Sequence, residues 1–461
     1  MTRLWSMVAV LLCLVALQSG CSTRPNQPPS ATAQPASPPM GWNSWNSGVA
    51  LTEVNIKAVI DAMVASGMRD AGYRYVNLDA GWAAPHRTAD GELQADPTRF
   101  PDGMADLAKY AHDRGMLLGL YASPYDEGCS AQPALAAVGH ETADAKNYAA
   151  WGVDMLKYDW CRREADHQHQ VQVFSAMRDA LRASGRRIVY SINPNSSDDV
   201  TAGIRYDWSG IADMARATTD LVPVWQDRLP RLGPLDPFGW HTYLGVPEEF
   251  SIAARASVRS KPGYAVDADM LVAGIGWDEW VTMHLKSIRN TLTLGAPPDE
   301  VRQFATASDA QLLHLLTDNQ PNLTVDEQRI HLSLWAMLSA PLLAGNDVRS
   351  MSPQTRELLT DRDVIAIDQD SLAAPVHPLP AASQVLVKSL SDGAVAVAFY
   401  NAGDKEAGIK ATATDVGLAQ RDCYRVRDLW SHTDSTTSGP LGGDTVAPHA
   451  ITLLRVTPGC H

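Results

Sequence analysis

Residues 153–162 (VDMLKYDWCR) place three chemically useful side chains, those of Lys157, Asp159 and Cys161, directly after an apolar run. A short apolar run that ends in charged residues is typical of a buried parallel strand that emerges at the mouth of an α/β domain. Barrel enzymes carry their chemistry at this mouth. A structural ion pair between Lys157 and Asp159 at a strand end explains the same pattern, so the rest of the chain has to separate the two interpretations.

Other acids follow further strand-like runs. Asp79 follows YVNL, Asp220 follows ARATT, and Asp269 lies within DADM. In a barrel the C-terminal ends of all strands lie at one end of the barrel, so these carboxylates would lie close together there. Asp159 and Asp220 would be about two strands apart. Two carboxylates that flank a sugar bond are the minimal equipment for glycoside hydrolysis. One attacks the anomeric carbon, and the other protonates the departing oxygen and then activates water.

Cations and aromatic rings near these acids suit a sugar ligand. Lys157 and Arg216 would hold the nucleophile ionised and donate hydrogen bonds to sugar hydroxyls. Trp42, Trp45 and Trp82 would provide apolar walls for the C–H faces of the sugar, although packing in the core explains each tryptophan equally well.

The order of elements predicts an α/β fold. From Met40 to about Asp370, short apolar runs alternate with helical patterns at about 30 to 40 residues per unit, which implies a parallel sheet with crossover helices. We expect a (β/α)8 TIM barrel over residues 40–375. A doubly wound open sheet is the main alternative, but no GxGxxG motif follows a first strand. The expected strands include Tyr75–Asp79, Met116–Tyr121, Val153–Asp159, Arg187–Asn193 and Val364–Ile367, and the expected helices include Glu53–Ser66, Met104–Arg114, Thr142–Trp151 and Gln168–Ser184.

The last part of the chain has a different pattern. After about Pro380, short strand-like runs are separated by Asp-Gly, Gly-Gly and Ser-Gly turns, which predicts a small antiparallel β-sandwich over residues 376–461. We interpret this domain as structural, because it shows no aromatic platform. The expected strands are Gln384–Leu390, Ala394–Tyr400, Tyr424–Asp428 and Ile451–Val456.

Two segments of the barrel region have the character of insertions, Pro230–Arg259 and Gly295–Thr324. The first is rich in Pro and Gly and carries Trp240, His241 and Tyr243. Long loops at barrel strand ends commonly shape substrate pockets. A surface elaboration that never touches the ligand fits the same sequences.

The N-terminus predicts export. Residues 1–20 contain one basic residue, Arg3, and then the apolar run Leu4–Leu17, which is too short to span a bilayer and is typical of a signal peptide. The sequence QSGC that ends at Cys21 is similar to a bacterial lipoprotein processing site, although Gln18 departs from the aliphatic residue usual there. We expect a periplasmic or outer-membrane lipoprotein attached to the membrane only through a lipid on Cys21, or alternatively a secreted protein. Residues 21–39, rich in Pro, Ser, Ala and Gln, predict a disordered tether.

Composition and cysteine use narrow the class of protein further. The 461 residues carry a net charge of −14, so we expect no nucleic-acid partner. Cys129, Cys161, Cys423 and Cys460 form an even set that suggests two disulfides in an exported protein. Three pairings are possible, and proximity along the chain favours Cys129–Cys161 and Cys423–Cys460. There is no CxxC motif and no His/Cys cluster at zinc spacing, so no metal or other cofactor is expected.

These motifs together resemble those of the melibiase-type α-galactosidases, glycoside hydrolase family 27. LKYDWC (Leu156–Cys161) resembles the nucleophile motif of the family, and MGWNSW (Met40–Trp45) resembles its first barrel strand. A sandwich after the barrel is also the usual arrangement of the family. Further matches follow in order: NLDAGW (Asn77–Trp82), LQADPTRFPDGM (Leu93–Met104), RGMLLGLYA (Arg114–Ala122), IVYS (Ile188–Ser191), DADML (Asp267–Leu271), LWAMLSAPLLAGNDVRSMSP (Leu334–Pro353) and DVIAIDQD (Asp363–Asp370).

The resemblance implies a retaining exo-glycosidase that releases terminal α-D-galactosyl residues from oligosaccharides or glycoconjugates by double displacement. By position, Asp159 looks like the catalytic nucleophile, and Asp220, four residues after Arg216, looks like the acid/base. The spacing of Cys129 and Cys161 matches a disulfide of the family. The residues that fall where the family lines its sugar pocket are Trp45, Asp79, Tyr121, Lys157, Arg216 and Asp269.

Two positions depart from the pattern of the family. Ala80 follows Asp79 where a second acid is usual, which removes one acceptor for the hydroxyls around C4 and C6. Asn193 stands where a Glu helps to read the 2-position, and we expect it to contact the substrate. A lost acceptor at a buried hydroxyl typically costs about 1–3 kcal/mol, which is enough to change the sugar that fits. Galactose is therefore the default sugar, and β-L-arabinopyranose, the same ring without the C6 group, is the alternative.

Two other classes of function remain as alternatives. A non-catalytic glycan-binding protein built on a decayed barrel would have lost Asp159 or Asp220, and both are present. A metal-dependent barrel hydrolase would need His clusters at ligand spacing, whereas His167 and His169 belong to a polar helix and are expected to be solvated.

Overall fold

The computed structural model describes residues 37–126, 129, 132–226, 228–229, 233–234, 243–293, 306–442 and 445–460. The expected signal peptide, Cys21 and residues 21–36 of the expected tether lie outside the described residues, as do Trp240 and His241 of the first insertion. Among the residues that the structure describes, no helix combines the length and the apolar character needed to cross a membrane.

Eight parallel strands form the main sheet, in the order β11-β6-β5-β4-β3-β2-β1-β12. The sheet closes through Leu271, just after β11, which forms a parallel bridge with Ala344 of β12. Leu271 N donates to Leu343 O at 2.7 Å. The fold is therefore the expected (β/α)8 barrel. Its strands are β1 (Met40–Asn43), β2 (Tyr75–Leu78), β3 (Leu117–Ala122), β4 (Met155–Asp159), β5 (Val189–Asn193), β6 (Met214–Arg216), β11 (Ala265–Asp267) and β12 (Leu342–Ala344).

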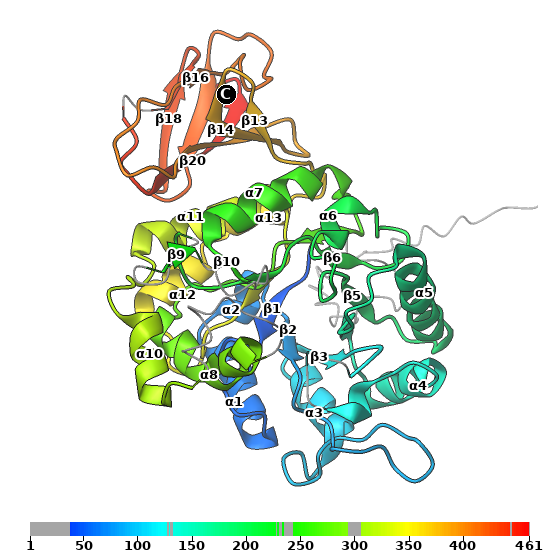
Figure 1. Ribbon diagram of the computed structural model, residues 1–461. Helices are drawn as coiled ribbons and strands as arrows, with labels where there is room; N and C mark the ends of the chain where they lie inside the picture. The colour runs from blue at the N-terminus through cyan, green and yellow to red at the C-terminus, as the bar shows by residue number, and fades with distance from the viewer. Residues whose placement is uncertain are drawn as a thin grey trace, which may run out of the picture. The chain divides into compact units, whose positions relative to one another are not determined.

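The helices lie on the outer side of these strands (Figure 1). Their ends follow local capping chemistry, because Thr52 and Asp166 accept hydrogen bonds from the first turns of α1 and α5, and Gly152 ends α4 in the left-handed conformation at φ 83°. The helices are α1 (Glu53–Ala65), α2 (Met68–Ala71), α3 (Gly103–His112), α4 (Glu141–Trp151), α5 (His167–Ala183), α6 (Ala202–Arg205), α7 (Val246–Ala256), α8 (Trp277–Thr293), α10 (Asp309–Thr317), α11 (Val325–Leu338), α12 (Pro353–Leu359) and α13 (Arg362–Asp368).

One predicted strand is wrong. Residues 364–367 belong to helix α13, and the last strand of the barrel is β12, which lies earlier in the chain. The side chain of Asp361 accepts a hydrogen bond from Val364 N and caps the helix. The apolar residues of such a short run fit one buried helix face as well as a buried strand, so the hydrophobic pattern alone does not separate them.

The described part of the first insertion lies beside the expected acid/base. Strand β10 (Tyr243–Leu244) pairs in parallel with β7 (Asp220–Leu221), with Tyr243 opposite Asp220. The Tyr243 ring packs edge-on against Trp280 of α8, with 5.3 Å between the ring centroids. This part of the insertion therefore packs beside Asp220, and its contact with a ligand stays a prediction. In the second insertion, residues 294–305 lie outside the described residues, and α10 packs against α8.

The C-terminal region contains a six-stranded antiparallel sheet in the order β13-β14-β15-β20-β17-β18 and a two-stranded sheet of β16 and β19. Side chains from both sheets share one apolar cluster, which includes Val397, Phe399 and Leu441. A disulfide joins Cys423 to Cys460, as expected. The strands are β13 (His377–Leu379), β14 (Ala382–Ser389), β15 (Val395–Asn401), β16 (Ala411–Thr412), β17 (Tyr424–Asp428), β18 (Thr433–Thr437), β19 (Pro440–Leu441) and β20 (Ala450–Pro458).

Helix α11 of the barrel packs against β14, β15 and β20. A lysine from the six-stranded sheet anchors this contact, since Lys388 is fully buried and its Nζ donates to Ala336 O at 2.7 Å, to Ser339 Oγ at 2.6 Å and to Ile367 O at 2.7 Å. The acceptors lie at the C-terminal ends of α11 and α13, where backbone carbonyls lack helical partners.

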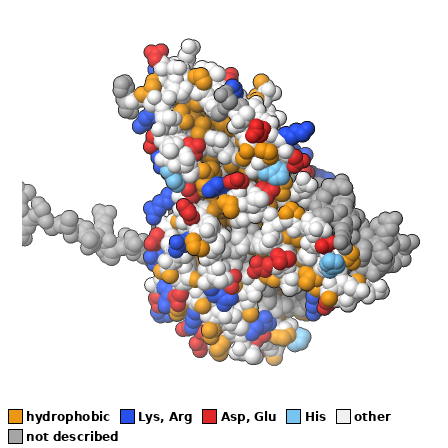
Figure 2. Space-filling view, turned by 90° about the vertical axis from the view of Figure 1, so that its left-hand side faces the viewer, with side chains coloured by type: hydrophobic (Ala, Val, Ile, Leu, Met, Phe, Trp, Pro, Cys, Tyr) orange, Lys and Arg blue, Asp and Glu red, His pale blue; other side chains and the backbone are white. Residues whose placement is uncertain are grey.

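Charged side chains of both signs are interspersed over the face that Figure 2 shows. The excess of acids in the sequence, 52 against 38 Lys and Arg, is therefore not gathered into one patch on that face.

Candidate active site

Lys157 links the ends of strands β2 and β4. Residues Met155, Lys157 and Asp159 share one face of β4, because side chains alternate along a strand, and Met155 and Lys157 line the barrel interior. Lys157 Nζ lies 2.8 Å from Asp79 Oδ2 and 3.6 Å from Asp159 Oδ2. The closer ion pair therefore joins the ends of two different strands. The sequence alone also allowed a simple structural pair of Lys157 with Asp159, and the contact with Asp79 goes beyond that pair.

Arg216, at the end of β6, holds two further acids. Its Nη1 lies 3.1 Å from Asp269 Oδ1, and its Nη2 lies 3.3 Å from Asp220 Oδ1. Asp269 follows β11 in a left-handed conformation at φ 71°, supported by a hydrogen bond from its N to Asp267 Oδ1 at 2.9 Å. Asp269 Oδ2 also accepts from Leu221 N at 2.8 Å, next to Asp220. The two predicted cations thus connect all four predicted acids.

The carboxyl of Asp159 is strongly influenced by its surroundings. Burial, and then the neighbouring carboxylates of Asp79 and Asp220, raise its pKa to about 7, although Lys157 and Arg216 oppose this shift. Burial lowers the pKa of Lys157, but Asp159 and Asp79 outweigh it, so that this pKa is raised above its usual value and Lys157 remains charged.

Tyr121 and Asn193 flank Asp159 on the two neighbouring strands. In the register of the sheet, Tyr121 pairs with Lys157 and Asn193 pairs with Asp159. Tyr121 OH lies 3.2 Å from Sγ of Cys161. Cys161 forms the expected disulfide with Cys129, with 5.3 Å between the Cα atoms, which ties down the loop that follows Asp159.

The three candidate tryptophans separate into two groups. Trp42 and Trp82 are fully buried, and their Nε1 atoms donate to the backbone oxygens of Asn346 at 2.8 Å and Tyr121 at 2.9 Å. Both therefore pack in the core. Trp45 is partly exposed and lies against His284, with 5.5 Å between the ring centroids. It is the one of the three with surface left for a ligand.

A small cavity lies in the barrel interior, and its lining includes Lys157, Arg216 and Asp269 but neither Asp159 nor Asp220. It also includes Asn43 and Asp267, which sequence reasoning did not assign to the site. Burial raises the pKa of Asp267 to about 6. The signal for Asp267 was present in the same DADM motif as Asp269, and the signal for Asn43 was its position at the end of the first strand.

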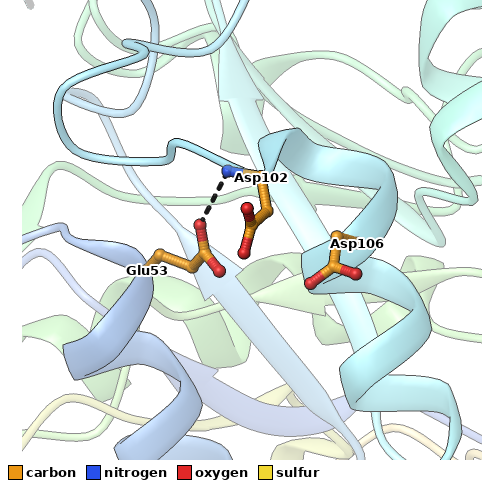
Figure 3. A group of neighbouring side chains, drawn as sticks. All are labelled: Glu53, Asp102 and Asp106. Carbon is orange, nitrogen blue, oxygen red and sulfur yellow. Dashed lines mark hydrogen bonds between the residues drawn. The ribbon is translucent and has the colours of Figure 1, made fainter.

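A group of three acids with carboxylate oxygens close together lies outside this site (Figure 3). Glu53 lies at the start of α1, and Asp102 and Asp106 lie at the start of α3. The ammonium of Lys57 is 2.5 Å from Glu53 Oε1, 3.1 Å from Asp106 Oδ2 and 4.0 Å from Asp102 Oδ2. A lysine already supplies the positive charge here, so the group is an ion-pair network.

Comparisons with known proteins match both parts of the chain. The family model described as α-galactosidase A matches residues 37–227 and 304–370, and that of the α-galactosidase C-terminal β-sandwich domain matches residues 381–456. The α-galactosidase A of Cellvibrio japonicus is 30% identical over 437 residues, which cover 91% of this chain and 92% of that protein.

Solved structures agree with these matches. α-Galactosidase I from Mortierella vinacea superposes with a TM-score of 0.73 at 26% identity, covering 91% of this chain and 97% of that one. A family 27 β-L-arabinopyranosidase from Geobacillus stearothermophilus has a TM-score of 0.65 at 21% identity, covering 92% and 97%, and shares the fold. With both family models matched in order along the barrel and the sandwich, the chain belongs to the melibiase-type α-galactosidases, glycoside hydrolase family 27.

Proposed function

We propose that the protein is a retaining exo-α-galactosidase in which Asp159 is the nucleophile and Asp220 is the acid/base. The observation that carries this proposal is the network in which Lys157 contacts Asp79 and Asp159 while Arg216 contacts Asp269 and Asp220. Asp79, Asp159 and Arg216 lie at or directly after the C-terminal ends of barrel strands, and Asp220 and Asp269 lie in the segments that follow β6 and β11. The named activity of the C. japonicus relative supports the galactosyl specificity.

In the first step, the Asp159 carboxylate attacks the anomeric carbon and forms a covalent glycosyl ester. The protonated Asp220 donates its proton to the glycosidic oxygen, which leaves with the electron pair of the broken bond. In the second step, Asp220, now a carboxylate, takes a proton from water, and the water oxygen attacks the same carbon and releases Asp159. Both carboxyl groups return to their starting states.

The cations assist both steps through charge. Lys157 stabilises the ionised form of Asp159 before attack and again when the carboxylate departs from the ester. Arg216 holds Asp220 near the leaving group while it pairs with Asp269 on the next strand. Trp45 and Tyr121 are proposed to bound the sugar ring, and Asp79, Asn193 and Asp269 to accept or donate hydrogen bonds to its hydroxyls.

A second sugar is favoured by one observation. Asp79 Oδ2 already accepts from Lys157 and from Asn43 at 3.3 Å, and Asp79 Oδ1 accepts from Ala80 N at 2.9 Å. The next residue, Ala80, adds no acceptor beside it. A pocket with fewer acceptors around C6 suits β-L-arabinopyranose, which lacks that group.

The test compares aryl α-D-galactopyranoside with aryl β-L-arabinopyranoside, using the mature protein and its Asp159→Asn variant. Faster release from the galactoside, lost in the variant, is expected. Preference for the arabinoside would replace the proposed sugar but keep the nucleophile. Hydrolysis that persists in D159N at the rate of the unsubstituted protein would contradict the catalytic assignment itself.

We further propose that the protein is exported, cleaved before Cys21 and attached to a membrane through a lipid on that cysteine. The apolar run Leu4–Leu17 and the QSGC sequence support this. Labelled fatty acid should enter the protein and be lost in Cys21→Ser. Release of unlabelled mature protein to the medium by cells that produce the unsubstituted chain would support plain secretion instead.

A further inference from the structure

The segment from Arg216 to Asp220 carries one of the two proposed catalytic groups, yet its middle has no regular structure. Strand β6 ends at Arg216, and β7 begins at Asp220, so residues 217–219 lie outside both strands. Besides the backbone hydrogen bond from Ala217 N to Asp267 O at 2.8 Å, side chains from elsewhere hold the backbone that places Asp220.

Asn195 supplies much of this support. It is 3% exposed, and its Nδ2 donates to Arg216 O at 3.0 Å and to Thr218 O at 2.8 Å. Its Oδ1 accepts from Gly203 N at 2.7 Å. The three contacts agree on one orientation of the Asn195 amide. Its NH2 group must face the two carbonyl oxygens, and its oxygen must face the N–H of Gly203.

Helix α7 holds the same segment from another direction. Glu249 is fully buried, and its Oε1 accepts a hydrogen bond from Thr218 Oγ1. Burial raises the pKa of Glu249 well above its usual value, which favours the neutral carboxyl beside this backbone. Residue 218 is thus bound through its carbonyl to Asn195 and through its hydroxyl to Glu249.

The turn that carries Asn195 also reaches the loop after the proposed nucleophile. Asn195 N donates to Asn193 Oδ1 at 3.0 Å, and Asn193 pairs with Asp159 in the sheet. Ser196 Oγ accepts from Cys161 N at 3.2 Å. One short turn, residues 193–196, therefore contacts the chain next to both proposed catalytic acids.

We propose that Asn195, assisted by Glu249 through Thr218, is a positioning residue that fixes Asp220 relative to Asp159. Neither Asn195 nor Glu249 is assigned to contact the sugar. Their role is to hold the path of residues 216–219, in which the guanidinium of Arg216 bonds to the carbonyl of Thr219 and to the carboxylate of Asp220. The inference rests on the proposed function, because it assigns a role within that reaction.

The experiment uses aryl glycosides of the sugar that the protein hydrolyses, with leaving groups from acidic to weakly acidic phenols. Displacement of the general acid slows substrates whose leaving group needs a proton and spares those that do not. For Asn195→Ala we expect kcat/KM to fall about 10- to 100-fold for phenyl glycosides. For dinitrophenyl glycosides the loss should stay within about threefold. Equal losses for all leaving groups, or no loss, would overturn the proposal.

Thr218→Val keeps the size of the side chain and removes the hydrogen bond to Glu249. T218V should steepen the dependence of kcat/KM on the leaving group, as N195A does. If N195A does not fold, T218V tests the proposal in its place. The matched control is Asn401→Ala in β15, since Asn401 is 1% exposed and its Nδ2 donates to three backbone carbonyls far from the barrel site. N401A should lower thermal stability and leave the leaving-group dependence unchanged.

Asp220→Ala separates failure of this inference from failure of the proposed function. If D220A steepens the leaving-group dependence and neither N195A nor T218V does, Asn195 does not position the acid. If D220A leaves that dependence unchanged, Asp220 is not the acid/base. The proposed mechanism then fails, and with it the role that this inference gives to Asn195.

Discussion

At the scale of single residues, the site is defined by charges that are paired both across strands and along them. Lys157 lies closer to Asp79, which follows β2, than to Asp159 of its own strand, and Arg216 contacts both Asp220 and Asp269. Asp79 and Asp269 are thereby paired with cations from other strands, whereas Asp159 is paired with Lys157 of its own strand. Mutation of one member should therefore disturb the electrostatics of the others.

The buried carboxyl of Asp159 should lower stability at neutral pH. Its pKa of about 7 in the folded protein lies above the value near 3.9 of an unfolded chain, so the folded state binds the extra proton between these values. Stability therefore falls as pH rises through this window, by up to about 4 kcal/mol. Asp159→Asn does not ionise and should be more stable than the unsubstituted protein at pH 8, but not at pH 4. Urea unfolding at the two pH values measures the difference, and a constant difference would contradict it.

Residue types at strand ends could be predicted from the sequence, because the rule that parallel strands share one open face requires no coordinates. The acids and cations that the structure brings together were named in this way, and their roles in catalysis stay predictions. The supporting residues were not. Asn195 lies in a turn and belongs to no motif, and Glu249 lies in an insertion, so nothing local connected either residue to Thr218.

At the scale of elements, short α6 lies directly against the strand end that carries Arg216. A Cβ added to Gly203 would lie 1.9 Å from Arg216 O and 2.9 Å from Asn195 Nδ2. The glycine is therefore required by close approach of two backbones rather than by its own conformation.

Gly203→Ala should displace the segment that carries Asp220. We expect kcat/KM to fall about 100-fold and the free energy of unfolding to fall by about 1–3 kcal/mol. The matched control is Gly210→Ala, where an added Cβ meets no atom within 4 Å. Steady-state kinetics and urea unfolding of both variants check this, and G203A with full activity would show that the segment tolerates the shift.

Elements were predictable where their patterns were long. Helices α1, α3, α4 and α5 and strands β2 to β5 lie within a few residues of the predicted ranges. Helix α13 was mistaken for a strand, because seven residues are too few to show a helical period. Strand β12 has only three residues, and the bridge through Leu271 that closes the barrel cannot be seen in a sequence pattern.

At the scale of the whole molecule, barrel and C-terminal sheet share a core. One apolar cluster includes Leu334 and Leu338 of α11 together with Ala396 of β15 and Leu453 of β20. The domain boundary between barrel and sandwich at residues 375 and 376 stays a prediction. In the folded protein, the two parts bury apolar surface against each other.

Lys388→Met should weaken this contact. The variant leaves three buried acceptors without their donor, and an unsatisfied buried acceptor typically costs about 1–3 kcal/mol. Lys146→Met, on the exposed face of α4, is the control and should change the free energy of unfolding by less than about 0.5 kcal/mol. Urea unfolding measures both, and similar values for the two variants would show that the anchor is not needed.

The same anchor limits how this chain could recombine with its relatives. A chimera that joins this barrel to the sandwich of another family member would place a different residue at the ends of α11 and α13. Two carbonyl oxygens and one hydroxyl oxygen there accept hydrogen bonds from the ammonium group of Lys388 in this chain. Exchange of the sandwich should therefore succeed when the incoming β14 carries lysine at the position of Lys388, or when α11 and α13 are exchanged with it.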